Sequence, residues 1–213
     1  MLFNSYIFIF LFFPLVLIGY YGLNFAGQNR TALVFLTGMS LWFYGYNNIN
    51  YLFILIISIF FNFAISAVIP LSKNLVIKRF FLCLGILLNI GILFYFKYYD
   101  FFIENVNALC KTSLPLLRLM LPLGISFYTF QQLSYVVDSY RGECRDYGFW
   151  EYAAYVSFFP QLIAGPIVYH SELIPQFRNP ANRRICFENM SKGIYAFSLG
   201  LAKKVLIADT FSK

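Results

Sequence analysis

The sequence predicts an all-α, polytopic membrane protein, and its composition, the length of its apolar segments and the placement of its charges all indicate that class. Of the 213 residues, 60% are hydrophobic and 12% are charged, whereas about a quarter of the residues of a soluble domain carry charge. Because so few polar side chains cannot cover a water-facing surface, lipid must cover part of it.

The net charge of +7 is typical of a membrane protein whose basic cytoplasmic loops face anionic lipid headgroups. No basic stripe interleaves with exposed aromatics, so we expect no nucleic-acid partner. The four cysteines are widely scattered without a CxxC pair, and the chain has one histidine. We therefore expect no metal site.

The predicted spans follow from hydropathy and length. Residues 2–21 form an apolar stretch long enough to cross about 30 Å of hydrocarbon. This stretch lacks a basic leading region and a small-x-small cleavage site, which favours a retained first span over a cleaved signal. The further predicted spans are 31–46, 51–69, 80–96, 121–137 and 193–208.

Two segments are less regular. Residues 97–118 mix aromatic side chains with scattered charges, a pattern typical of a segment that lies in the membrane interface. Residues 150–169 are apolar but are broken by Pro160, Gly165 and Pro166. Irregular backbone at membrane depth persists only where protein buries it or where it lines a watery cavity.

Basic residues give a test of this layout, because they concentrate in cytoplasmic loops. With Met1 outside, the basic loops 73–79 and 141–145 fall inside. A full crossing by 150–169 would then place Arg178, Arg183, Arg184 and Lys192 outside, against the rule. A re-entrant segment, which dips in and returns to the cytoplasmic side, removes the conflict. Under this layout, 97–118 carries its basic residues on the less favoured face.

Six residues are candidates for shaping an internal cavity. Polar and ionisable side chains in or beside a span are costly and usually face a cavity or a partner. Asp138 also lies one helical turn before Arg141, a spacing that favours a paired helix end. The six candidates are Gln131, Asp138, Arg141, Gln161, Gly165 and Pro166.

Three other side chains allow a chemical interpretation. His170 alone has an unperturbed pKa that suits a general base near neutrality. No serine, cysteine or carboxylate lies at a meaningful spacing from it in the sequence, so we do not expect it to be catalytic. Lys203 and Lys204 fit either a site for a phosphate-bearing donor or a pair that snorkels to the interface, and the sequence favours snorkelling.

Three stretches carry a family pattern, namely LPLGISFYTFQQLSYVVDSYRG (121–142), FFPQLIAGPIV (158–168) and GLAKKVLIADT (200–210). They resemble consecutive signatures of the membrane-bound O-acyltransferases, in the branch typified by the alginate O-acetylation proteins. The resemblance implies that residues 1–213 are the N-terminal part of a single acyltransferase domain. It also implies a multi-pass enzyme of the bacterial inner membrane that takes an acyl group, typically acetyl, from a cytoplasmic donor.

The same resemblance implies the donor, the acceptor and the partner. The donor is a substrate such as acetyl-CoA or another acyl carrier, and no cofactor is bound. The acceptor is an exported or cell-wall polysaccharide, reached through a periplasmic or extracellular partner protein. The family's catalytic histidines lie in tryptophan-histidine motifs beyond this stretch, and Trp42 and Trp150 are followed by Phe43 and Glu151. We therefore expect no catalytic residue in 1–213, and we expect this portion alone to be inactive.

Two alternatives remain open at this point. Broken spans with polar groups at membrane depth also occur in transporters and channels, although the two halves of this chain show no internal repeat. A non-catalytic scaffold that binds a partner through its aromatic-rich spans is the third interpretation.

Overall fold

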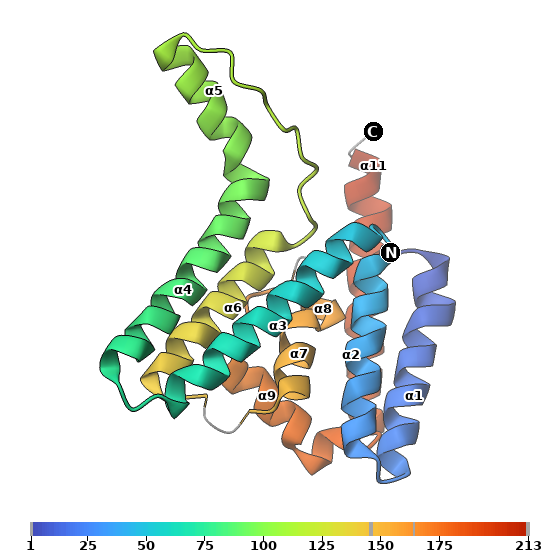
Figure 1. The fold of residues 1–213 in the computed structure, drawn as a ribbon. Coiled ribbons are helices and arrows are strands. Elements are labelled where there is room, and N and C mark those ends of the chain that lie inside the picture. Colours follow the sequence, from blue (N-terminus) through green and yellow to red (C-terminus); the bar gives the residue numbers. More distant parts are fainter. Residues whose placement is uncertain (1, 145–146, 164, 212–213) are drawn as a thin grey trace.

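The computed structural model describes residues 2–144, 147–163 and 165–211, which form a bundle of helices (Figure 1). No strand occurs among these residues, so the all-α prediction is confirmed. The longer helices are α1 (Phe13–Phe25), α2 (Asn29–Gly45), α3 (Ile49–Leu71), α4 (Leu75–Leu93), α5 (Tyr99–Cys110), α6 (Ile125–Arg141), α7 (Phe149–Ser157), α9 (His170–Arg178) and α10 (Phe187–Ala202). The short elements are η1 (Phe8–Phe12), η2 (Phe94–Tyr98), α8 (Phe159–Leu162), η3 (Pro180–Arg183), η4 (Lys203–Ala208) and α11 (Asp209–Phe211).

Several of these helices match the dimensions of a bilayer. Three helical runs, Phe8–Phe25, Ile49–Leu71 and Leu75–Cys110, are long and apolar enough to cross a membrane. The helices α2 and α6 have 17 residues each, which is about 26 Å of helix and close to the thickness of the hydrocarbon core. Each of the first five predicted spans overlaps one of these helices. The chain is therefore a multi-pass membrane protein.

Local chemistry fixes where the helices begin and end. The Asn48 side chain accepts a hydrogen bond from the backbone of Asn50 at 2.9 Å and caps α3. Asn74 caps α4 in the same way through Val76. The last turn of α6 closes at Gly142, whose φ of 87° is in the left-handed region that glycine adopts at helix ends.

The fourth span is longer than the hydropathy pattern predicts. The structure shows one helical run of 36 residues from Leu75 to Cys110, which is about 54 Å long and exceeds the hydrocarbon thickness. Figure 1 shows its α5 end projecting beyond the rest of the bundle. The interfacial segment predicted at 97–118 thus consists of the end of this helix followed by a return loop. Its placement in the membrane interface stays a prediction.

The core lies around α6, which packs against α3, α4 and α7. Its fully buried residues include Tyr128, Tyr135 and Val136. A second cluster joins the first two helices to α8, with Phe12, Phe43 and other aromatic rings in mutual contact. The first amino acid of α8, Phe159, meets the Phe12 ring edge-on at a centroid distance of 5.2 Å. The core thus surrounds the segment predicted to be re-entrant.

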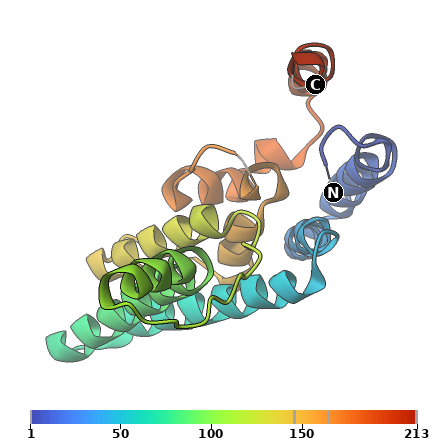
Figure 2. The same cartoon turned by 90° about the horizontal axis from the view of Figure 1, so that it is seen from above.

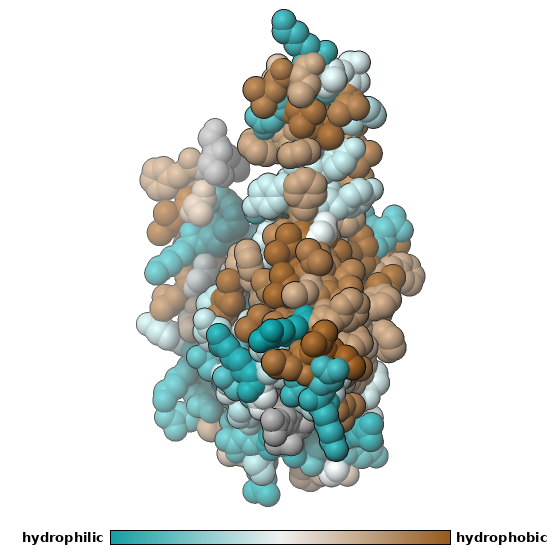
Figure 3. Space-filling model, turned by 60° about the vertical axis from the view of Figure 1, so that its left-hand side comes forward, coloured by the Kyte–Doolittle hydropathy of each residue, from teal (hydrophilic) through white to brown (hydrophobic). Residues whose placement is uncertain are grey.

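Basic residues gather at one end of the bundle. The connections α1–α2, α3–α4 and α6–α7 and the elements α9 and η3 all lie at the lower end in Figure 1, which we call the basic end. Figure 3 shows hydrophilic side chains gathered at this end and hydrophobic ones above it. The described basic residues in these segments or within the adjoining helical turn are Arg30, Lys73, Lys78, Arg79, Arg141, Arg178, Arg183 and Arg184, and Lys192 lies in the first half of α10.

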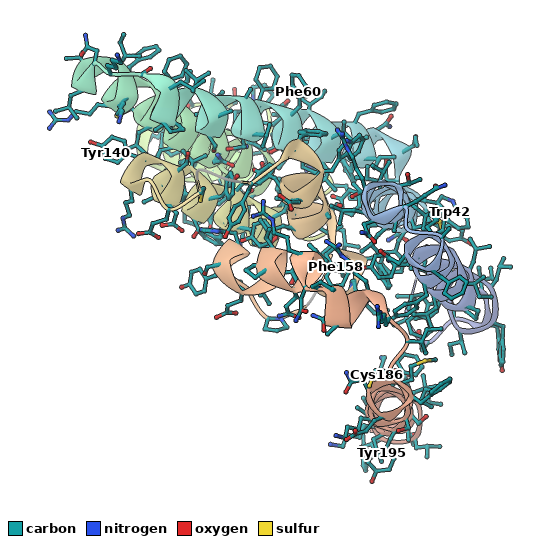
Figure 4. The ribbon with its side chains drawn as sticks, turned by 90° about the horizontal axis from the view of Figure 1, so that it is seen from below. Trp42, Phe60, Tyr140, Phe158, Cys186 and Tyr195 are labelled. Carbon is teal, nitrogen blue, oxygen red and sulfur yellow. The ribbon has the colours of Figure 1, made fainter. Side chains whose placement is uncertain are left out.

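The last long helix stands apart from the bundle. No residue of α10 is buried, and Figures 2 and 4 show its axis separated from the other helices. Its Phe197 ring lies 6.5 Å from Phe13 and 6.4 Å from Phe8, measured between centroids. Further along, Lys204 forms an ion pair with Asp209. The carboxylate partner and the exposure of Lys204 agree with a residue that reaches water from an apolar helix.

Candidate functional site

The apolar stretch after α6 folds into a hairpin that enters the bundle and returns (Figure 1). We call residues 149–169 the hairpin. The Tyr155 hydroxyl donates to the Val168 carbonyl at 3.1 Å, so the returning segment lies beside α7. Tyr147 and His170 flank the hairpin, and their ring centroids are 5.6 Å apart. Both ends of the hairpin therefore lie at the basic end, as the re-entrant prediction requires. Its depth in the bilayer stays a prediction.

Prolines and glycine set the sharp turn of the hairpin. Phe158 leaves the helical region with ψ of 107°, and Pro160 then occupies the first turn of α8, where its missing N–H breaks no helical hydrogen bond. The Gln161 side chain donates to the Tyr155 carbonyl at 2.9 Å and ties the tip to α7. A Cβ atom on Gly165 would lie 2.5 Å from Cα of Gln161, so the chain reverses more tightly than another residue allows.

The tip of the hairpin touches the first residue before α6. Gly124 has φ of 71°, and a Cβ atom there would lie 2.4 Å from the carbonyl oxygen of Leu162. This close approach requires glycine both for its conformation and for its lack of a side chain. Two of the three family-like stretches, 121–142 and 158–168, are therefore in direct contact at this point.

At the base of the hairpin, Asp138 and His170 meet. The Oδ2 atom of Asp138, in the last turn of α6, lies 3.1 Å from Nε2 of His170, the first residue of α9. The same carboxylate accepts from the Ser134 hydroxyl at 3.1 Å. Its Oδ1 atom lies 3.4 Å from Nη1 of Arg141. The predicted Asp138–Arg141 pair is thus present, and His170 is an additional partner.

Burial and aromatic rings enclose this pair. His170 is 2% exposed, and the rings of Tyr135 and Tyr155 meet it edge-on at 5.4 and 6.4 Å between centroids. The Cys144 sulfur lies 3.5 Å from Nε2 of His170. Burial, followed by the carboxylates of Asp138 and Glu143, raises the pKa of the Cys144 thiol to about 12. The thiol is therefore protonated at neutral pH.

This cluster lacks the geometry of a nucleophilic triad. Asp138 and Cys144 both approach Nε2 of His170 most closely, at 3.1 and 3.5 Å, whereas a triad uses opposite ring nitrogens for its base and its orienting carboxylate. A protonated thiol is also a poor nucleophile. Among the described residues, no group of three or more His, Cys, Asp or Glu side chains is arranged to hold a metal ion. The cluster is suited to fix a structure rather than to perform chemistry.

A surface cavity of about 470 Å³ opens beside the hairpin at the basic end. Arg178 and Tyr147 contribute to its wall, and the guanidinium lies 5.2 Å from the centre of the Tyr147 ring. Arg178 also forms a forked ion pair with Glu151, with Nε 2.6 Å from Oε1 and Nη2 2.7 Å from Oε2. The lining residues are Glu143, Tyr147, Pro175, Arg178 and Asn179.

The structure distributes the six sequence candidates along α6 and the hairpin, and not around that cavity. Gln131 and Gln161 are buried at 3% and 7% exposure. Gln161 and Gly165 form the tip of the hairpin, Pro166 follows in its returning segment, and Asp138 and Arg141 lie at its base. None of the six lines the surface cavity. Their cavity-shaping role stays a prediction.

Two features were missed by reasoning from the sequence. The carboxylate partner of His170 lies 32 positions earlier, and the thiol beside it 26 positions earlier, so neither is visible as a local spacing. A buried amide network was also missed, in which Asn62 donates to Gln132 at 2.6 Å and Asn89 donates to Asn62 at 2.5 Å. Single amides inside apolar spans were the available signal, since such residues usually bond across helices.

Comparison with known proteins places the chain among acyltransferases. The chain is 39% identical to the peptidoglycan O-acetyltransferase of Helicobacter pylori, over 98% of this chain and 45% of that protein. It is 33% identical to the probable alginate O-acetylase AlgI of Pseudomonas aeruginosa, over 100% of this chain and 41% of that protein. The teichoic acid D-alanyltransferase of Lacticaseibacillus rhamnosus is 24% identical over 42% of the chain. No solved structure matches.

The chain spans less than half the length of the curated relatives that match it along its whole length. The family model of the membrane-bound O-acyltransferases matches residues 93–213. This match covers α6, the hairpin, α10 and the short elements after it, and all three family-like stretches fall within it. The chain belongs to the membrane-bound O-acyltransferase family.

Proposed function

We propose that this chain is the N-terminal part of an enzyme that transfers an acetyl group to an exported or cell-wall polysaccharide. The observation that carries the proposal is the 39% identity to a peptidoglycan O-acetyltransferase across 98% of the chain. The similarity to probable alginate O-acetylases supports the same chemistry, the esterification of a sugar hydroxyl.

The geometry supports a structural contribution of these residues to the reaction. A hairpin that enters the bundle from the basic end creates irregular, protein-buried backbone at depth, the arrangement in which membrane proteins build substrate paths. The basic end faces the cytoplasm under the positive-inside rule, where an acyl donor such as acetyl-CoA or another carrier is available. The general base belongs to a tryptophan-histidine motif downstream, and residues 1–213 by themselves are inactive.

Transfer to an exported polymer also requires a route across the inner membrane. We assign the protein to that membrane because donor and acceptor lie on its opposite sides. A periplasmic or extracellular partner completes the transfer to the polymer. The end opposite the basic end, which includes α5, faces that partner in this arrangement.

Gene deletion followed by complementation tests this function. Ester-linked acetate, released from purified peptidoglycan and from exopolysaccharide by mild alkali, should fall in one of the two polymers when the gene is deleted. The full-length protein should restore it. Alanine in place of the downstream motif histidine should reduce acetylation about 10²–10⁴-fold, the usual contribution of a general base.

Glu172→Gln is a matched control, because Glu172 is an exposed acid on α9. This variant should acetylate like the wild type at equal abundance in the membrane. The proposal is wrong if deletion leaves the acetate of both polymers unchanged. Retention of full activity by the downstream alanine variant would show that the general base lies elsewhere.

A further inference from the structure

The internal hydrogen bonds of the hairpin hold its shape but not its position. The Tyr155 hydroxyl bonds to the Val168 carbonyl, and the Gln161 amide bonds to the Tyr155 carbonyl. All of these groups belong to residues 149–169. Such bonds would survive a rigid shift of the hairpin relative to α6, so its register must be set by contacts with other elements.

The hairpin packs extensively against α2 and also meets α6, where the rings of Tyr152 and Tyr135 lie 4.4 Å apart between centroids. Two further contacts restrain the hairpin at opposite ends of α6. At the tip, the backbone of Leu162 lies against Gly124. At the base, His170 lies against Asp138. The two α6 positions are 14 residues apart, about 21 Å along a helix. The tip contact is steric and prevents closer approach, whereas the base contact is a hydrogen bond and prevents separation.

The hydrogen bond between Asp138 and His170 is strong because it is shielded from water and because no other group on α6 replaces it. His170 is 2% exposed, and the side chain of Asp138 is 13% exposed. A hydrogen bond to a charged group gains strength in such surroundings, and a partner left alone there retains an unsatisfied polar group. Ser134 and Arg141 also contact the carboxylate, but both belong to α6 and cannot restrain the hairpin.

We infer that Asp138 and His170 are a positioning pair that holds the base of the hairpin against α6. We call this contact the clasp. It fixes the relative placement of two family-like stretches, 121–142 and 158–168. The pair touches no reacting atom. Its effect on acyl transfer rests on the proposed function, but its effect on the hairpin does not. A displacement of about 1 Å at a reaction centre costs about 10²-fold in rate, so loss of the clasp should lower acetylation by that order.

Cys144 offers a reporter that needs no enzymatic activity. It is 7% exposed and its sulfur lies against His170, so opening of the clasp uncovers it. In full-length protein with Cys144 as its sole cysteine, N-ethylmaleimide should react slowly. Asp138→Leu and His170→Leu should each lower acetylation about 10²-fold. His170→Leu, which keeps the carboxylate that raises the pKa of Cys144, should also speed the reaction of Cys144 with N-ethylmaleimide. The double variant should be no worse than the worse single one, because both remove the same contact.

Conservative variants separate positioning from general destabilisation. Asp138→Asn keeps an oxygen acceptor, and His170→Gln keeps an N–H donor, so both should retain acetylation and a slow Cys144 reaction. Glu172→Gln, exposed on the same helix as His170, should match the wild type in both measurements. If neither leucine variant accumulates in membranes, the Asn–Gln double variant decides, since protection of its Cys144 supports the clasp and rapid alkylation overturns it.

Two results would overturn the inference. One is wild-type acetylation together with slow Cys144 alkylation in the leucine variants. The other is lost acetylation with Cys144 still protected, because the pair would then act on something other than the hairpin. If the wild-type protein acetylates neither polymer, the proposed function fails, while the alkylation rates still test the clasp.

Discussion

Gly124 shows how a single residue joins two parts of this fold. Its φ of 71° and the 2.4 Å between a Cβ placed there and the Leu162 carbonyl oxygen leave no room for a side chain. The sequence places a glycine before an apolar helix but gives no hint of the distant backbone that lies against it. The contact places the start of α6 directly beside the tip of the hairpin.

Gly124→Ala should destabilise the protein for this reason. The left-handed conformation costs a residue with a side chain about 1–2 kcal/mol, and the clash with Leu162 adds to it. Gly91→Ala is the matched control, because a Cβ placed at Gly91 would meet no described atom within 4 Å beyond its chain neighbours and the backbone of its own helix. Thermal unfolding of the two variants in detergent should show a lower midpoint for Gly124→Ala alone. Equal midpoints would contradict the assigned contact.

At the scale of elements, a buried amide network joins three helices. Asn62 on α3 donates to Gln132 on α6 at 2.6 Å, and Asn89 on α4 donates to Asn62 at 2.5 Å. All three side chains are at most 3% exposed. Lipid supplies no hydrophobic drive between helices, so packing and such interhelical hydrogen bonds hold them together.

Asn62→Leu should weaken the association of α3, α4 and α6 by disrupting this amide network. The change removes a donor to Gln132 and an acceptor for Asn89, and a buried polar group left unsatisfied costs about 1–3 kcal/mol. Asn105→Leu is the control, because Asn105 is exposed and bonds within its own helix to Phe101. The unfolding midpoint in detergent should fall for Asn62→Leu and stay near the wild type for Asn105→Leu. An unchanged midpoint for Asn62→Leu would show that the network contributes little.

The sequence predicts elements well where hydropathy and length decide them. The spans 31–46 and 51–69 correspond to α2 and α3 almost residue for residue. Hydropathy predicts the fourth span at 80–96, but the helical run extends from Leu75 to Cys110 because charged residues at both ends do not break a helix. The polar helix α9 was not predicted, since its nine residues are too short for a clear hydrophobic period.

The candidate site was predictable in its outline and not in its contacts. Pro160, Gly165 and the basic residues of 178–192 predict a re-entrant segment. The structure shows Val168 returning beside Tyr155, and the place of this segment in the membrane stays a prediction. The clasp between Asp138 and His170 depends on how the hairpin packs, which no local spacing encodes. Asp138 lies on α6 and His170 begins α9, with the hairpin between them. The positions of both helices must be known before this pair can be recognised.

At the scale of the whole molecule, the distribution of basic residues and the projection of the long helical run distinguish the two ends of the bundle. Most of the described basic residues collect at the basic end, while the 36-residue run ending at Cys110 extends from the other end, where Lys111 and Arg118 follow it. Because basic loops tend to remain cytoplasmic, this asymmetry predicts that the basic end faces the cytoplasm. In Figure 2 α10 stands apart from the bundle, and none of its residues is buried by the described residues. Under the positive-inside rule we therefore expect both ends of the hairpin at the cytoplasmic side.

The labelling of two native cysteines tests this account most directly. Cys110 ends α5, Cys186 precedes α10 at the basic end, and both are exposed. Each is kept as the sole cysteine of the full-length protein, in cells whose outer barrier is permeabilised. A membrane-impermeant maleimide should label Cys110 at once, and Cys186 only after the inner membrane is opened. Labelling of both cysteines from outside would mean that residues 150–169 cross the membrane, and would contradict the re-entrant hairpin.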